Sequence, residues 1–184
     1  MTGMYDQFEV YGVKFIRVKE EHLEQVRTWR NSDFVRSRML YQEIITPEMQ
    51  LKWFHTVNNE ANYYFIAEYM GKPAAVINVK DIKDKIGEPG IYLVEEDWQN
   101  TSVASLISVA FGEFLFGMLK LEKLYLHVRK DNEEALKFNL WAGYKIIDGK
   151  SGADFYYLEL DKAAVDNNAR TNKLKKFLNK KQTL

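Results

Sequence analysis

The stretch 90–129 sets the tightest limit on how this chain can fold. It begins with "GIYLVEED" (90–97), which has the composition of a β-strand, and continues with an apolar segment over 102–119, which predicts a helix. A second strand pattern follows in "KLYLHVR" (123–129). Strands joined by a helical crossover can pair in parallel, as in a βαβ unit. We therefore expect a sheet with a parallel part and with helices on its faces.

The other periodic segments surround this unit. Gly71-Lys72 lies between two strand patterns, which predicts an antiparallel hairpin. Thr46 followed by Pro47 suits the start of a helix, and Gly143 suits the end of another. The expected strands are 12–18, 63–70, 73–82, 144–149 and 154–160, and the expected helices are 20–31, 46–57 and 131–143. The predicted fold class is α/β, with a central mixed sheet flanked by helices.

We expect a single domain over residues 1–184. This length suits one hydrophobic core, and no linker, repeat or low-complexity segment interrupts the sequence. Residues 162–184 have helical propensity and are basic toward their end. We expect this C-terminal tail to pack loosely.

The composition excludes several classes of protein. The 26 Lys+Arg balance the 26 Asp+Glu, whereas a general nucleic-acid binder has a basic excess. The chain has no cysteine, which rules out disulfides, thiolate metal sites and a cysteine nucleophile. Serine, glycine and glutamate interrupt the apolar run 103–119, so we expect no membrane span. Because "MTGMYDQFEV" has no signal-peptide pattern, we expect a cytoplasmic location.

The junction "QNTSVA" (99–104) lies between a predicted strand and a predicted helix. Main-chain N–H groups and the helix dipole at such a junction favour an anion. Phosphate loops usually contain glycine, and this one has none; Ser102 can replace glycine only if its φ is negative. The alternative is an ordinary connection in which Thr101 or Ser102 caps the helix.

The order of elements and several motifs resemble the GNAT acetyltransferase superfamily. Its phosphate loop, Gln/Arg-x-x-Gly-x-Gly/Ala, is similar to Gln99-x-x-Ser102-x-Ala104, with serine in place of glycine. Downstream, "NEEALKFNLWAGY" places Asn132, Ala135, Gly143 and Tyr144 in register, with Asn139 where many members have tyrosine. The resemblance covers roughly residues 12–160. The segments "WRNSDFVRSRM" and "ITPEMQLKWF" resemble the branch of ribosomal-protein N-acetyltransferases, and more closely the amino-sugar N-acetyltransferases of pseudaminic-acid synthesis.

The resemblance implies that acetyl-CoA is the co-substrate and that no metal takes part. Asn132 is expected on the pantetheine arm, although an Asx residue before a helix also serves as a cap. The residues implied for acetyl-CoA are Val94, Gln99, Asn100, Thr101, Ser102, Val103, Ala104, Asn132 and Ala135.

Transfer of an acetyl group to an amine needs a base for the amine and stabilisation of the oxyanion. His127 is the preferred base, because an imidazole titrates near neutral pH. Alternatives are the acidic cluster 95–97, or a purely structural histidine. Asn139 can hydrogen-bond the leaving sulfur but cannot protonate it. Possible replacements for the missing acid, each also a candidate core residue, are Tyr144, Tyr156 and Tyr157.

The acceptor side is implied by the same resemblance. Arg30 and Arg36 could meet a phosphate or carboxylate, while an aromatic ring could stack on a sugar or base. The alternative is that the two tryptophans are core residues of amphipathic helices. We assign no chemistry to His22 and His55. The implied acceptor-binding residues are Trp29, Arg30, Asn31, Met39 and Trp53.

The leading hypothesis is an acetyl-CoA-dependent N-acetyltransferase for a small primary amine, with a nucleotide-linked amino sugar favoured. Transfer would be direct, through a tetrahedral intermediate. One alternative is acetylation of protein N-termini, as by ribosomal-protein acetyltransferases. Another is a non-catalytic module that binds or senses CoA. We expect no nucleic-acid or membrane partner, and either a monomer or a homodimer.

Overall fold

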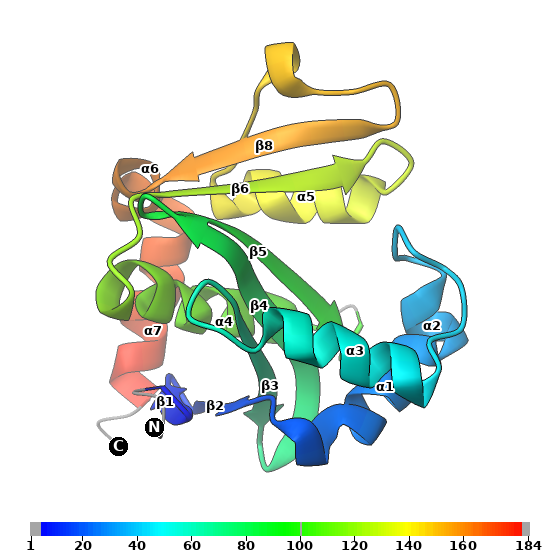
Figure 1. The fold of residues 1–184 in the computed structure, drawn as a ribbon. Coiled ribbons are helices and arrows are strands. Elements are labelled where there is room, and N and C mark those ends of the chain that lie inside the picture. Colours follow the sequence, from blue (N-terminus) through cyan, green and yellow to red (C-terminus); the bar gives the residue numbers. More distant parts are fainter. Residues whose placement is uncertain (1–4, 100, 182–184) are drawn as a thin grey trace.

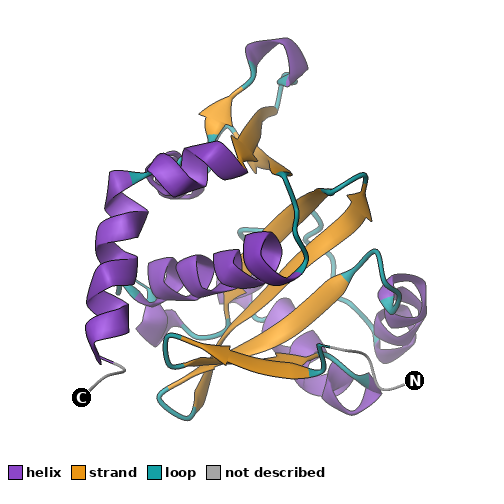
Figure 2. Cartoon of the chain, turned by 90° about the vertical axis from the view of Figure 1, so that its left-hand side faces the viewer, coloured by secondary structure: helices purple, strands orange, loops and turns teal. Residues whose placement is uncertain are grey.

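The structure is a computed structural model that describes residues 5–99 and 101–181. Its described strands form one eight-stranded sheet in the order β1-β2-β3-β4-β5-β6-β8-β7. Helices α1 and α3 lie on one side of the sheet, and α4 and α5 lie on the other (Figure 1, Figure 2). The predicted mixed sheet with flanking helices is therefore confirmed.

The strands are β1 Gln7–Val10, β2 Val13–Arg17, β3 Tyr63–Tyr69, β4 Lys72–Lys83, β5 Ile86–Leu93, β6 Lys123–Arg129, β7 Lys145–Ile146 and β8 Phe155–Asp161. The helices are α1 Leu23–Asn31, α2 Asp33–Arg36, α3 Pro47–Val57, α4 Val103–Gly112, α5 Glu133–Ala142, α6 Lys162–Asn167 and α7 Ala169–Lys181. A π-helical segment, Glu113–Met118, extends α4. Short 3-10 helices cover Glu20–His22, Glu96–Trp98 and Asp148–Lys150.

Strands β5 and β6 form the parallel part of the sheet, and they pair only at their beginnings. The paired positions are Ile86 with Lys123 and Gly87 with Leu124. Further along β5, Pro89 and Gly90 come after Glu88. Proline has no N–H to donate, and glycine weakens a strand. Beyond this point the two strands diverge (Figure 1). The other strand pairs of the described sheet are antiparallel.

Two hydrophobic clusters hold helices to the sheet. The larger cluster joins the sheet to α4, its π-helical extension and α7; its rings include Phe15, Phe65, Phe111 and Phe114, each 0–1% exposed. The smaller cluster lies under α1 and α3, and it includes Val26 and Phe54. The sheet is thus covered on both faces from β2 to β5. Among the described strands, β5 and β6 lie side by side but pair only at their beginnings, and we call this gap in pairing the seam of the sheet.

Several predicted boundaries agree with the structure. The strand 123–129 and the helix starting at Pro47 match, and Thr46 Oγ1 accepts a hydrogen bond from the Met49 N–H at 3.2 Å. Gly71 has a φ of +76° in the predicted hairpin, and Gly143 has a φ of +107° at the end of α5. Each of these features depends on local geometry that few residues other than glycine, proline and Asx or hydroxyl caps supply.

Other expectations were wrong. The strand predicted at 90–97 begins at Ile86 and ends at Leu93, and the predicted helix 102–119 becomes π-helical from Glu113. Strand β1 and helix α2 were not predicted, and the strand expected at 144–149 is limited to Lys145–Ile146. In the described part of the tail, 162–181, Leu178 is only 9% exposed and Lys175 Nζ lies 2.8 Å from Glu113 Oε1. This part therefore packs against the main core and the π-helical extension of α4.

Candidate active site

The opening between the diverging ends of β5 and β6 organises the candidate site. The N-terminus of α4 follows β5, and the N-terminus of α5 follows β6, so both helices begin near this end of the sheet (Figure 1). Beyond Gly87 the described part of β5 has no pairing with β6. Main-chain groups that would otherwise be used between the two strands are therefore left for another partner.

The predicted phosphate loop has the backbone that its sequence requires. Ser102 has a φ of −78°, so serine can occupy this position without strain. Thr101 Oγ1 accepts a hydrogen bond from the Val103 N–H at 3.2 Å and donates to Trp98 O at 2.6 Å. Thr101 therefore binds the first turn of α4, as the capping alternative expects, and the φ of Ser102 meets the condition set for a phosphate loop. Ala104 is half-buried, and Asn100 lies outside the described residues.

The remaining predicted cofactor residues fall at two places. Val94 is buried in the smaller core cluster, and its N–H donates to Ala74 O at 3.1 Å. Asn132 caps α5, since its Oδ1 accepts the Ala135 N–H at 3.0 Å. Asn132 therefore acts as a helix cap, one of its two expected roles. The cap uses only Oδ1, so Nδ2 can donate a hydrogen bond to a ligand.

Helix α5 is only half-buried. None of its ten residues is fully buried, although it carries Leu136, Phe138, Leu140 and Trp141. Ala135, Leu136 and Ala142 pack on the main core, as expected of the apolar face of an amphipathic helix. The open strand junction and the N-termini of α4 and α5 lie near the same end of the sheet (Figure 1).

His127 meets a carboxylate that the sequence analysis did not identify. Its Nδ1 lies 3.3 Å from Oε1 of Glu88 on β5, and the other carboxylate oxygen of Glu88 lies 3.0 Å from Lys80 Nζ on β4. The side chain of Glu88 is 16% exposed and that of His127 is 33% exposed. A carboxylate can only accept here, so Nδ1 carries a proton, and in the neutral form of the imidazole Nε2 keeps its lone pair.

Aromatic rings surround this pair. The imidazole of His127 lies 5.0 Å from the ring of Phe155, 5.2 Å from Tyr157 and 6.1 Å from Tyr125. Burial, followed by the charge of Glu88, raises the pKa of Tyr125. Burial, followed by the charges of Asp81 and Glu88, raises the pKa of Tyr64 to about 12. Both phenols are therefore protonated near neutral pH and can donate hydrogen bonds.

The other candidates for proton transfer lie elsewhere. Residues 95–97, the acidic alternative to His127 as base, are exposed at the turn before α4. Tyr144 belongs to the main core, and burial raises its pKa, which makes it a weak acid. Tyr156 packs on the same core beneath Lys130, whose Nζ lies 5.4 Å from the ring centroid. Asn139 Nδ2 donates to Ala135 O of its own helix at 2.8 Å.

Two predicted acceptor residues support a loop. Arg30 Nη2 donates to Tyr41 O at 2.7 Å, while Asn31 exchanges hydrogen bonds of 2.8 and 2.9 Å with the main chain of Ile45. Arg36 Nη1 also donates to Gln42 O at 3.2 Å. These side chains hold the segment 37–46, which we call the acceptor loop and which contains Met39.

Three buried polar atoms near these side chains have no hydrogen-bond partner in the described chain, namely Arg30 Nη1, Arg36 Nε and Tyr92 Oη. Burial lowers the pKa of Arg30 and raises that of Tyr92. Trp29 and Trp53 pack on the smaller core cluster, and the ring of Trp53 lies edge-on to Tyr64 at 4.9 Å. The core alternative therefore holds for both tryptophans in this arrangement.

A cavity of about 450 Å³ lies between the acceptor loop and the ends of β6 and β8. Leu40 of the acceptor loop forms one wall, and Phe155, the neighbour of His127, forms another. The remaining lining residues are Arg129, Lys130, Asp131, Ala153 and Asp154. The sequence analysis named none of these residues, since the cavity is built by segments distant in the chain.

His22 and His55 have no place in this site. His22 Nδ1 accepts the Lys19 N–H at 3.0 Å in a local turn, and His55 is exposed on α3. Among the described residues, no group of three or more His, Asp or Glu side chains could hold a metal ion. No described helix is long and apolar enough to cross a membrane.

Comparison with known proteins identifies the class to which this arrangement belongs. Residues 23–144 match the model of the acetyltransferase (GNAT) family. The chain belongs to this family and is an acetyltransferase. It is 25% identical over 145 residues to Acetyltransferase PseH of Campylobacter jejuni, a match that covers 78% of this chain and 88% of PseH.

Solved structures agree in fold. The crystal structure of C. jejuni N-acetyltransferase PseH in complex with acetyl coenzyme A has a TM-score of 0.62 at 21% identity, and covers 82% of this chain and 99% of that chain. Spermidine N-acetyltransferase from Vibrio cholerae, in complex with CoA and spermine, has a TM-score of 0.74 at 15% identity, with coverage of 86% and 100%. Both structures are of acetyltransferases in complex with small molecules: acetyl coenzyme A in the first, and CoA with spermine in the second.

Proposed function

We propose that this acetyltransferase transfers the acetyl group of acetyl-CoA to the primary amine of a small acceptor, with a nucleotide-linked amino sugar favoured. The observation that carries the proposal is the contact of 3.3 Å between His127 and Glu88 beside the open β5–β6 junction. The match to Acetyltransferase PseH supports an amino-sugar acceptor over a polyamine. The cavity of about 450 Å³, which Phe155 links to His127, gives an acceptor space beside the proposed base.

Acetyl-CoA would supply the activated acetyl group as a thioester, held by the 99–104 loop, the α4 N-terminus and Asn132. His127 Nε2 would take the proton of the attacking amine, while Glu88 holds the imidazole in the required tautomer and balances its positive charge. Free main-chain N–H groups of β5 would stabilise the oxyanion of the tetrahedral intermediate.

The departing sulfur would leave without help from Asn139, whose amide N–H is already used within α5. This is chemically acceptable, because a thiol with a pKa of about 8.5 leaves readily as thiolate. Membership of an acetyltransferase family favours turnover over the non-catalytic alternative. A monomer or homodimer, and a single domain over residues 1–184, remain predictions.

The test is an acceptor screen with the purified chain and acetyl-CoA. Thiol release is followed with UDP-linked amino sugars, spermidine, aminoglycosides and N-terminal peptides of ribosomal proteins, and products are checked by mass spectrometry for one added acetyl group. We expect turnover with an amino sugar. Turnover with peptides alone would overturn the acceptor assignment, and no binding of acetyl-CoA would overturn the proposal as a whole.

A further inference from the structure

The phosphate loop carries no positive charge of its own. Residues 99–104 are all uncharged, and Glu95, Glu96 and Asp97 lie just before them, separated only by Trp98. A pyrophosphate bound at the α4 N-terminus would therefore lie near three exposed carboxylates. Main-chain N–H groups and the helix dipole partly offset this repulsion. A nearby cation from another part of the chain would offset it further.

Arg38 is in position to be that cation. It belongs to the acceptor loop, 61 residues away in sequence, yet its Nη2 lies 3.5 Å from Oε1 of Gln99, the first residue of the phosphate loop. Its guanidinium carbon stands 4.5 Å above the ring of Phe34, and its Nη1 donates to Phe34 O. The stacked ring fixes the plane of the guanidinium, while the contact with Gln99 is at the limit of a hydrogen bond.

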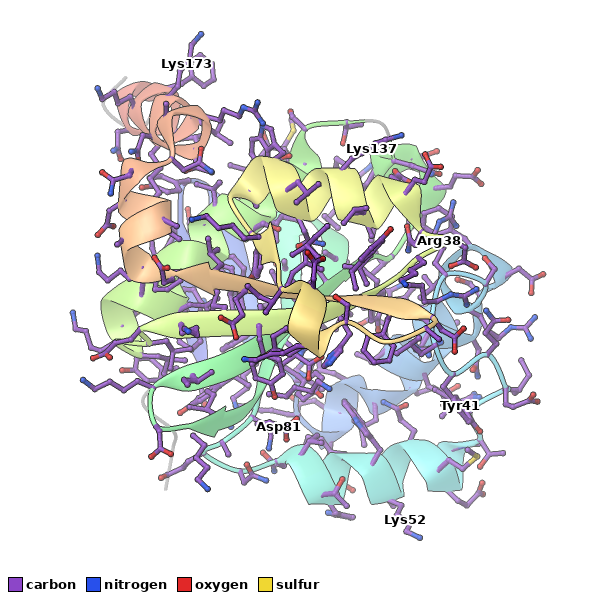
Figure 3. The ribbon with its side chains drawn as sticks, turned by 90° about the horizontal axis from the view of Figure 1, so that it is seen from above. Arg38, Tyr41, Lys52, Asp81, Lys137 and Lys173 are labelled. Carbon is purple, nitrogen blue, oxygen red and sulfur yellow. The ribbon has the colours of Figure 1, made fainter. Side chains whose placement is uncertain are left out.

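Two other cations are already paired with carboxylates: Arg129 binds Asp131, and Lys137 Nζ lies 3.0 Å from Glu133 Oε2 on α5. Lys130 stands over the ring of Tyr156. Arg38 forms no ion pair with a carboxylate within 5–99 and 101–181, and its side chain is exposed. Figure 3 shows Arg38 between α2 and the adjoining end of α5, whereas Lys52 points away on the opposite side of the molecule.

We propose that Arg38 binds the pyrophosphate of acetyl-CoA, and that this contact couples the co-substrate to the acceptor loop; the inference rests on the proposed function. The geometry requires only that the guanidinium exchange the weak contact with Gln99 for a phosphate oxygen. Leu40, two residues further on, is a wall of the acceptor cavity. A pyrophosphate bound by Arg38 would therefore restrain the acceptor loop that carries this wall.

The experiment measures binding, so that no acceptor has to be known. Calorimetry compares CoA with 3′-dephospho-CoA for the wild type, Arg38→Ala and Arg38→Lys, with Lys52→Ala as a control that also removes one exposed cation. We expect Arg38→Ala to weaken both ligands equally, by about tenfold, because a charge-assisted hydrogen bond is lost. Arg38→Lys should stay within about threefold of the wild type, and Lys52→Ala should be unchanged.

Hydrogen exchange tests the coupling in the same samples. CoA should protect amides of the acceptor loop in the wild type and in Lys52→Ala, but not in saturated Arg38→Ala. Unchanged affinity in a folded Arg38→Ala variant would overturn the inference while leaving the proposed function intact. A loss confined to CoA would place Arg38 on the 3′-phosphate and would also overturn it. Failure of the wild type to bind either nucleotide would instead refute the proposed function.

Discussion

Nδ1 of His127 and Oε1 of Glu88 lie 3.3 Å apart on two strands that have stopped pairing with each other. The contact crosses the seam of the sheet, and Lys80 extends it to β4 through the second carboxylate oxygen of Glu88. A half-buried carboxylate is thus held from both sides, next to an imidazole whose other nitrogen is free to act. This relationship gives the site a base together with the group that orients it.

Removing the base should cost more than removing its partner. We expect His127→Ala to lower kcat by ~10²–10⁴-fold, the usual effect of losing a general base. Glu88→Gln keeps the shape but can no longer select one tautomer, so kcat should fall by about tenfold, with acetyl-CoA affinity unchanged. Steady-state kinetics of the two single variants and the double variant provide the measurement.

The double variant discriminates between coupled and independent roles. If Glu88 acts through His127, adding Glu88→Gln to His127→Ala should lower kcat no further. A full additional loss in the double variant would show that Glu88 acts on the substrate itself.

Asn132 allows its two possible roles to be separated by substitution. Asn132→Ala removes the cap on Ala135 and should lower the free energy of unfolding by ~1 kcal/mol. Asn132→Asp keeps the capping oxygen but loses the amide N–H, and it adds a charge that the N-terminus of α5 tolerates. Thermal unfolding and calorimetry with acetyl-CoA should show a stable Asp variant with weakened binding. If the Asp variant binds as tightly as the wild type, Asn132 is a cap and nothing more.

Restoring an acid at position 139 tests whether protonation of the thiolate limits the rate. Asn139→Tyr should leave acetyl-CoA binding within a few-fold and raise transfer to an accepted amine. Phe138 and Trp141 stack at 6.1 Å on the same helix, so overpacking of about 1–3 kcal/mol could offset the gain. Thermal unfolding run alongside would reveal that effect. A stable variant that binds acetyl-CoA and transfers no faster would show that departure of the sulfur does not limit turnover.

The raised pKa of Tyr64 predicts a loss of stability at alkaline pH. The phenol ionises near pH 10 in the unfolded chain but only at about 12 in the folded protein, because burial and then Asp81 and Glu88 oppose its charge. The unfolded state therefore binds fewer protons between these values, and stability falls as the pH rises through them. Other buried tyrosines add to this loss. Tyr64→Phe should remove up to ~2 kcal/mol of it, measured by urea unfolding from pH 8 to 11.5. Parallel curves for the two proteins would contradict the prediction.

Arg38 occupies a position that no local pattern could have indicated. Its contact with Gln99 joins segments 61 residues apart, and the sequence around Arg38 resembles any exposed end of a short helix. The same holds for the cavity behind Leu40, which is closed by the ends of β6 and β8. The sequence also does not indicate Glu88 as a site residue. Gly87, Pro89 and Gly90 disfavour a strand locally, so the sequence predicts a strand that begins after Glu88.

Features that depend on a few neighbouring residues could be predicted from the amino-acid sequence alone. Thr46 and Pro47 started α3, Gly143 ended α5, and the alternation of "KLYLHVR" defined β6, because caps, positive φ and strand pleat are properties of the local chain. The motif at 99–104 likewise indicated the family that residues 23–144 match. Which residues face the open β5–β6 junction depends instead on how distant strands pair. Pairing with β4 extended β5 back to Ile86 against local propensity, and divergence from β6 after Gly87 placed Glu88 opposite His127. Contacts of this kind depend on the register between distant strands, because a shift of one residue would turn these side chains to the opposite face of the sheet.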